Sequence, residues 1–176
     1  KGKQMKKVLA MVLAAAAVFM LFGCSKDSAD TKGEGVMTYE EYAAAALESQ
    51  VVIEAYVQAK QSWWEEKATV YTQDKDGAYF IYNMACSEAD YAKLTVGTKI
   101  KVTGYKSEWA GEVEIIDATF EIEDGKYVAK AFDATSIIGD EAALLEHQNQ
   151  FVAFKGLTVE ASTDPDGNEV AYLYKY

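Results

Sequence analysis

Hydrophobic and polar residues alternate along much of the middle of this 176-residue chain. The alternation is clearest where Val51, Ile53, Ala55 and Val57 recur at every second position. In an extended strand, successive side chains point to opposite faces, so a period of two places these four residues on one face. The pattern therefore predicts a half-buried strand over residues 51–58.

Three more segments continue this pattern toward the C-terminus. Residues 68–73 and 78–84 are rich in Tyr, Val and Phe, and the sequence Asp-Lys-Asp-Gly between them is typical of a hairpin turn. Residues 98–106 alternate again, with Gly104 where a strand must bend or be approached closely. Together they predict a hairpin followed by a fourth strand.

The fifth predicted strand, over residues 112–123, changes phase in its middle. Val113 and Ile115 share one face, whereas Ile116, Ala118 and the apolar residues after them continue in the opposite parity. An extra residue in one strand shifts the parity in this way. The pattern predicts a β-bulge between Ile115 and Ile116.

Short helices are expected around these strands. The sequence Thr-Tyr-Glu-Glu at residues 38–41 matches a capping box and starts an apolar pattern at helical spacing through residue 49. Residues 87–94 predict a short helix or turn, and residues 140–148 a further short helix. Residues 126–132 either add a sixth strand or lead the chain out of the sheet.

The N-terminus has the features of an export signal. Two lysines precede an uncharged apolar run over residues 8–22, which is too short to span a bilayer comfortably. The run ends in Leu-Phe-Gly-Cys at residues 21–24, which resembles the lipobox of bacterial lipoproteins. The resemblance implies that residues 1–24 are a signal peptide and lipobox, and that acylation of Cys24 anchors the protein in the lipid bilayer, on the extracytoplasmic face of the cell membrane. An ordinary secretory signal with an incidental cysteine is the alternative.

Residues 25–37 are small and polar and predict a flexible tether. Beyond it, the segments VVIEAYVQ, ATVYTQDKDGAYFIY and LTVGTKIKVTGYKSEWAGEVEIIDATFEIE resemble an OB-fold domain of the anticodon-binding-like type. The resemblance implies an all-β fold with short helices, namely a five-stranded Greek-key barrel within residues 38–132. OB-folds bind oligonucleotides, sugars or proteins, so the fold alone does not name a ligand.

Residues 133–176 are expected to hold a linker, a helix and two strands of a second, truncated OB-like unit. Val152, Phe154, Gly156 and Thr158 repeat the register of the first strand about 101 residues later. The alternative is that this hairpin packs on the first barrel.

Charge excludes some partners. The chain contains no arginine and has a formal net charge of −11, and loss of residues 1–24 would change this to −15. An acidic surface without guanidinium groups repels phosphate backbones, which disfavours nucleic acid as a partner.

Catalytic chemistry also has little support. His147 is the only histidine, Cys86 is the only cysteine besides Cys24, and no phosphate-binding glycine loop is present. The Asp-x-Asp-Gly sequences at residues 74–77 and 164–167 match part of a calcium loop, but turns use the same residues. We therefore expect no enzyme activity, no cofactor and no metal site.

Tryptophan placement is the most specific functional signal. All three tryptophans fall in the connections that OB-folds place beside their binding face. Tyrosines in the phase opposite the core could extend an aromatic platform, which gives the candidate ligand-binding residues Trp63, Trp64, Trp109, Tyr56, Tyr71 and Tyr79. Acidic residues beside these loops favour a glycan or an extracellular protein as ligand, and single-stranded nucleic acid is the competing hypothesis. The alternative is that the tryptophans pack on each other and close the mouth of the barrel.

Overall fold

The structure, a computed structural model, describes residues 32–175. Cys24 and the predicted signal peptide lie outside the described residues. Within residues 32–175, no helix is long and apolar enough to cross a membrane.

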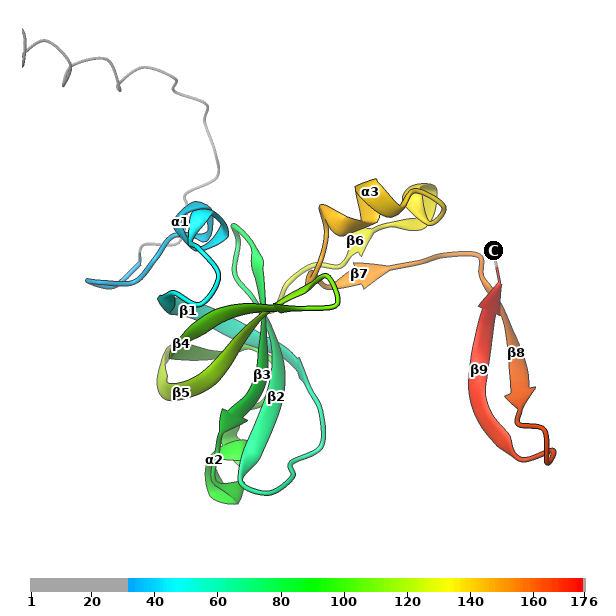
Figure 1. The fold of residues 1–176 in the computed structure, drawn as a ribbon, viewed down its shortest axis with the longest axis horizontal. Helices are drawn as coiled ribbons and strands as arrows, with labels where there is room; N and C mark the ends of the chain where they lie inside the picture. The colour runs from blue at the N-terminus through cyan, green and yellow to red at the C-terminus, as the bar shows by residue number, and fades with distance from the viewer. Residues whose placement is uncertain (1–31, 176) are drawn as a thin grey trace, which may run out of the picture.

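Five strands form a closed barrel in the order β1-β2-β3-β5-β4 (Figure 1). Neighbouring strands are antiparallel except for β3 and β5, which are parallel. The bounds of the strands are β1 Gln50–Lys60, β2 Lys67–Gln73, β3 Ala78–Ala85, β4 Thr98–Trp109 and β5 Glu112–Lys126. This order, with a helix between β3 and β4, is the topology of the five-stranded Greek-key OB-fold, so the expected fold class is confirmed.

The period-two pattern correctly locates the core. Val51, Ile53, Ala55 and Val57 on β1 are each at most 1% exposed. They lie opposite the β4 residues around Ile100, which is fully buried. The alternation that predicts the strand therefore also selects the face that the barrel encloses.

The predicted bulge lies in β5, next to Gly104. Thr103 and Tyr105 of β4 pair with Thr119 and Ile116 of β5, so β5 has one residue more than β4 in this interval. Asp117, inside that interval, has a φ of 48°. The bulge is thus confirmed, centred one to two residues beyond its predicted position.

Two short helices lie at opposite ends of the barrel (Figure 1). In α1, Tyr39–Ala44, the Oγ1 of Thr38 accepts the N–H of Glu41 at 3.2 Å, and the Glu41 carboxylate accepts the N–H of Thr38 at 2.8 Å. The predicted capping box is therefore confirmed, although the helix ends at Ala44 rather than continuing to residue 49. Helix α2, Glu88–Lys93, is capped by Ser87.

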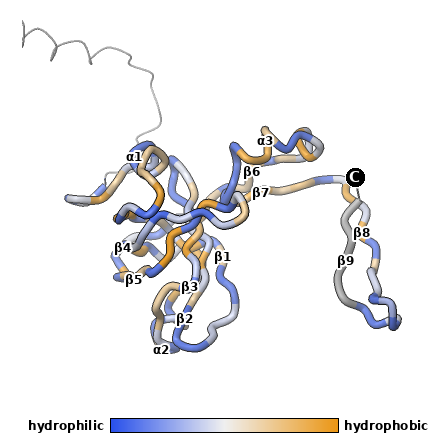
Figure 2. Tube along the Cα trace, in the orientation of Figure 1, coloured by the Kyte–Doolittle hydropathy of each residue, from blue (hydrophilic) through white to orange (hydrophobic). Residues whose placement is uncertain are grey.

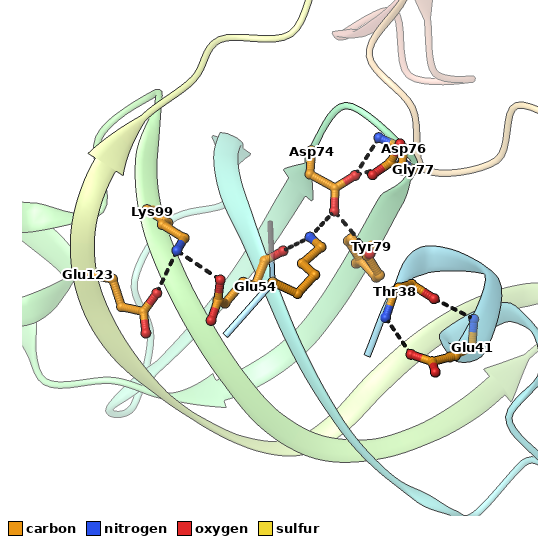
Figure 3. A network of polar contacts seen from close by, with 10 residues as sticks. Thr38, Glu41, Glu54, Asp74, Asp76, Gly77, Tyr79, Lys99 and Glu123 are labelled. Atoms are coloured by element: carbon orange, nitrogen blue, oxygen red, sulfur yellow. Dashed lines mark hydrogen bonds and ion pairs between the residues drawn. The ribbon is translucent and has the colours of Figure 1, made fainter. Parts of the chain in front are cut away.

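The turn between β2 and β3 is organised by a buried carboxylate (Figure 3). Asp74 Oδ1 accepts the backbone N–H groups of Asp76 and Gly77, each at 2.7 Å. Its Oδ2 accepts the Tyr79 hydroxyl at 3.1 Å and lies 2.6 Å from Lys32 Nζ. The carboxylate of Asp164 likewise accepts N–H groups of its own turn, from Asp166 and Asn168. Both Asp-x-Asp-Gly sequences thus form turns.

The prediction of a tether is wrong for residues 32–37. Val36 is buried, the N–H of Met37 donates to the carbonyl of Val52 at 2.9 Å, and Lys32 Nζ donates to the carbonyl of Glu54 at 2.9 Å. This segment lies against the barrel because its apolar and charged side chains find partners there. Residues 25–31 lie outside the described residues.

The chain leaves the barrel after β5, so residues 126–132 do not form a sixth barrel strand. Strand β6, Phe132–Asp133, pairs in parallel with β7, Val152–Ala153, and α3, Glu141–Leu145, lies between them in sequence. The strands β8, Thr158–Thr163, and β9, Glu169–Lys175, form an antiparallel hairpin that stands apart from the barrel in Figure 1 and has a hydrophilic tip in Figure 2. The expected single strand through residues 152–158 is interrupted, because Gly156 has a φ of +72°.

Candidate functional site

A cavity of about 810 Å³ lies on the outer side of the barrel. Its lining combines aromatic rings, amide side chains and two carboxylates. The lining residues are Gln58, Ala59, Tyr71, Phe80, Tyr82, Trp109, Glu112, Glu114, Asn149, Gln150, Phe151 and Val152.

The floor of the cavity is one row of residues across four strands. Ala59 of β1 pairs with Tyr71 of β2, Tyr71 pairs with Phe80 of β3, and Phe80 pairs with Glu114 of β5. Directly paired residues point to the same face of a sheet. The row therefore places two aromatic rings and one carboxylate side by side on the β1-β2-β3-β5 surface.

The aromatic part of this floor is ordered by ring contacts and one hydrogen bond. The rings of Tyr71 and Phe80 stack with centroids 5.0 Å apart, and the rings of Phe80 and Tyr82 lie 6.3 Å apart. The hydroxyl of Tyr71 accepts a hydrogen bond from Gln61 Nε2 at 2.9 Å. A ligand would thus meet a continuous apolar platform.

One wall of the cavity comes from a distant part of the sequence, the segment that follows α3. Gln148 Oε1 accepts the N–H of Val113 at 2.9 Å, and Asn149 Nδ2 donates to the carbonyl of Val113 at 2.9 Å. Further along, the N–H of Phe151 donates to Gln73 Oε1 at 2.8 Å. These bonds hold residues 148–151 against the β4–β5 hairpin and the end of β2.

The two carboxylates of the lining lie two residues apart on β5. Glu114 is 8% exposed, and its burial raises the pKa of its carboxyl group. Burial also raises the pKa of Glu112, as does the neighbouring charge of Glu114, while a hydrogen bond with Asn149 partly opposes the shift. Burial therefore disfavours the charged form of both carboxyl groups.

The three tryptophans do not form one cluster. Trp109, the last residue of β4, is 74% exposed and lines the cavity. Trp64, in the β1–β2 connection, is 71% exposed and lies outside the cavity lining. Trp63 is half-buried, and its indole N–H donates to the carbonyl of Cys86 at 2.9 Å. The structure therefore does not bring the tryptophans of the two loops together in this cavity, and the exposure of Trp64 and Trp109 contradicts the alternative of a tryptophan plug.

Of the three tyrosines expected to form the aromatic platform, only Tyr71 lines the cavity. Tyr79 is fully buried, where its ring packs against Tyr39 and Tyr42 of the α1 region and its hydroxyl donates to Asp74. Tyr56 is half-buried and packs against Tyr127, outside the cavity lining. On β3 the outward aromatic residues are Phe80 and Tyr82 instead of Tyr79.

Other chemically notable residues lie away from this cavity. His147 stacks on Phe132 with ring centroids 3.9 Å apart, and its Nδ1 lies 3.0 Å from Gln150 Oε1. Cys86 is a buried free thiol whose pKa is raised by burial. Across residues 32–175, no group of three His, Cys, Asp or Glu side chains is arranged to hold a metal ion.

Sequence reasoning missed Phe80, Tyr82 and the segment from Asn149 to Val152. The two β3 residues could have been found by counting pairs outward from the predicted hairpin turn, which makes Tyr71 the partner of Phe80. No local pattern marks residues 149–152, because their role depends on a contact made across the fold.

No family model matches this sequence, and no curated protein sequence matches it. Among solved structures, the chain is similar to aspartyl tRNA synthetase from Entamoeba histolytica, with 15% sequence identity and a TM-score of 0.40. That match covers 62% of this chain and 27% of the synthetase chain, so it spans little more than a quarter of the synthetase. The OB-fold assignment rests on the order of the barrel strands.

Proposed function

We propose that this protein is a membrane-tethered, extracytoplasmic binding module that acts without catalysis and takes a glycan or a protein as its ligand. The observation that carries the proposal is the cavity built on the Ala59–Tyr71–Phe80–Glu114 row and bordered by Trp109. Pockets of several hundred Å³, mostly apolar with a few placed polar groups, are the usual form of a binding site. The β2–β3 face is also the surface through which OB-folds bind their ligands.

The polar groups of the cavity argue against an oligonucleotide. Glu112 and Glu114 would repel phosphates, and among the lining residues there is no lysine to contact them. Carboxylates and amides can instead accept and donate hydrogen bonds to sugar hydroxyls or peptide groups. A glycan or a protein segment therefore suits the cavity better than nucleic acid.

Two exposed tryptophans provide a matched test of the site. Glycan and peptide arrays probed with the purified chain should identify binders, and Trp109→Ala should weaken their binding by about 5- to 150-fold, since an aromatic contact contributes about 1–3 kcal/mol. Trp64→Ala is the control, because Trp64 is equally exposed but lies outside the cavity lining. Equal effects of the two substitutions would contradict the proposal, and a steep loss of binding with salt would point to nucleic acid.

The membrane tether is tested separately through the two cysteines. If Cys24 is acylated, Cys24→Ala should abolish incorporation of radiolabelled fatty acid and release or stall the protein. Cys86→Ala should leave the labelling unchanged, because Cys86 is buried in the barrel. Unchanged labelling and membrane retention in Cys24→Ala would refute the anchor.

A further inference from the structure

We propose that the cavity recognises a positively charged side chain, a lysine or an arginine, presented by a partner protein. This inference rests on the proposed binding function and specifies the ligand class of the same cavity. The observations that carry it are a largely buried glutamate whose carboxylate faces the cavity without a protein partner within residues 32–175, a second carboxylate beside it, and aromatic rings in the same lining.

Glu114 is the centre of the argument. The residue is 8% exposed, and its carboxylate lines the cavity. Among the described residues, no hydrogen bond or ion pair to its carboxylate is found, and burial is the one influence that shifts the pKa of this group. A buried charge normally has a partner, because its transfer out of water is costly. A cationic group that enters the cavity could therefore pair with this carboxylate.

Glu112 strengthens the requirement for a cation. It lies two positions before Glu114 on β5, on the same side of the strand, and also lines the cavity. Two neighbouring carboxylates in a poorly solvated site repel each other, which contributes to the raised pKa of Glu112. A bound ammonium or guanidinium group would remove both the repulsion and the missing contact.

The rings around the carboxylates suit the rest of such a side chain. Tyr71, Phe80, Tyr82 and Trp109 line the same cavity. Aromatic faces attract cations within about 6 Å of the ring centroid, and the aliphatic stems of lysine and arginine pack on apolar surfaces. The cavity thus offers contacts for the charge and for the stem.

The charge of the whole chain is consistent with such a partner. The net charge of −11 and the absence of arginine attract basic surfaces and repel anionic ones. A neutral glycan could stack on the rings, but it would leave the negative charge of the Glu112–Glu114 pair uncompensated. Of the two ligand classes in the proposed function, these observations favour a basic protein segment.

The test uses a blocked decapeptide of alternating lysine and serine and the same peptide with every lysine acetylated. Titrated into the purified full chain and followed by nuclear magnetic resonance, the charged peptide should bind at least about tenfold more tightly than the acetylated peptide. The shifts should concentrate at residues that line the cavity. Binding should also weaken as the pH is lowered and Glu112 and Glu114 become protonated.

Glu114→Gln keeps the shape of the side chain and removes its charge, so it should weaken binding of the lysine peptide at least about tenfold. Glu108→Gln is the control, because Glu108 is exposed on β4 and outside the cavity lining. Urea unfolding of each variant would verify that it is folded.

Three results would overturn the cation inference: no binding of the lysine peptide at millimolar concentration, equal binding of both peptides, or unchanged binding by Glu114→Gln. If a glycan or neutral peptide binds, and Trp109→Ala but not Glu114→Gln abolishes that binding, the cation inference fails while the binding function stands. If neither substitution affects any binder, both proposals fail.

Discussion

The alternation of β4 places Lys106 on the buried face, and its hydrogen bonds explain why a lysine is found there. It follows Ile100, Val102 and Gly104 in the inward phase of β4 and is 7% exposed. Its Nζ donates to the carbonyls of Tyr42, Ala43 and Ala45 at 3.1, 2.8 and 2.9 Å. The last carbonyls of a helix lack partners within the helix. The ammonium group of Lys106 therefore caps the end of α1 and ties it to the barrel.

Replacing this lysine should destabilise the fold. Lys106→Met keeps the aliphatic stem but removes three charge-assisted donors, so the free energy of unfolding should fall by about 1.5–3 kcal/mol. Urea denaturation followed by circular dichroism would measure the change. Lys101→Met on the same strand, which points to the opposite face, should change it by less than about 0.5 kcal/mol. Similar effects for the two substitutions would argue against the capping role.

The adjacent residues Trp63 and Trp64 should differ strongly in their contribution to stability. Trp63 is half-buried and donates a hydrogen bond to Cys86, whereas Trp64 is 71% exposed. Trp63→Ala should lower the free energy of unfolding by about 1–3 kcal/mol, because it loses both packing and that bond. Trp64→Ala should change it by less than about 0.5 kcal/mol. Parallel urea titrations would decide, and a larger loss for Trp64→Ala would contradict this assignment.

At the scale of the elements, the close approach of β4 to the bulge in β5 depends on one glycine. A Cβ atom added to Gly104 would lie 2.6 Å from Ile115 Cγ2 and 2.8 Å from the carbonyl oxygen of Ile116. The bulge brings this part of β5 close to the backbone of β4, so the position has room for hydrogen only. Gly104 in β4 and the phase slip in β5 are separate features of the sequence, and both arise from the close contact between these two strands at the bulge.

Gly104→Ala should therefore destabilise the barrel. The added methyl group meets backbone atoms that cannot move aside freely, so the expected loss is about 1–3 kcal/mol of unfolding free energy. Gly139→Ala is a suitable control, because nothing lies within 4 Å of a Cβ at that position. Thermal unfolding of both variants would test this, and an unchanged melting temperature for Gly104→Ala would show that the strands can separate at no cost.

At the scale of the whole molecule, the cavity exists because two distant parts of the chain meet. The barrel supplies the floor, and residues 148–151 supply a wall through hydrogen bonds to Val113 and Gln73. Asn149 of this segment lines the cavity together with Glu112 and Glu114 and forms a hydrogen bond with Glu112, and burial raises the pKa of both carboxyl groups. Ionisation of these carboxyl groups is therefore less favourable in the folded state than in the unfolded state, which makes stability depend on pH.

The direction of that dependence follows from the raised pKa values of Glu112 and Glu114. Between the ordinary glutamate pKa and the raised value, the folded state binds more protons than the unfolded state, so stability falls as the pH rises through this window. Glu114→Gln should therefore be more stable than the original protein at pH 7, and the difference should shrink as the pH falls toward about 4. Urea titrations at both pH values would measure it. A variant that is less stable at pH 7 would contradict this prediction.

Local chemistry in the sequence by itself determined much of the barrel. The alternation from Val51 to Val57 identified the buried face of β1, because a strand with one buried face shows a period of two. The Thr38–Glu41 capping box located the start of α1, since both of its hydrogen bonds join residues three positions apart. The phase slip in residues 112–123 indicated the bulge, because an extra residue in one strand changes the parity of the buried positions. Each of these signals needs only neighbouring residues.

The tertiary structure alone decided which side chains share a site. Tyr79 lies in an almost continuous apolar run, so its face depends on the pairing of β3 with β2 and on the packing of α1 over it. Trp64 and Trp109 are equally exposed, yet only Trp109 lies on the cavity, and Asn149 reaches that cavity across the fold. Periodicity describes how a segment meets the core, whereas a site requires contacts between segments whose relative positions no local pattern specifies.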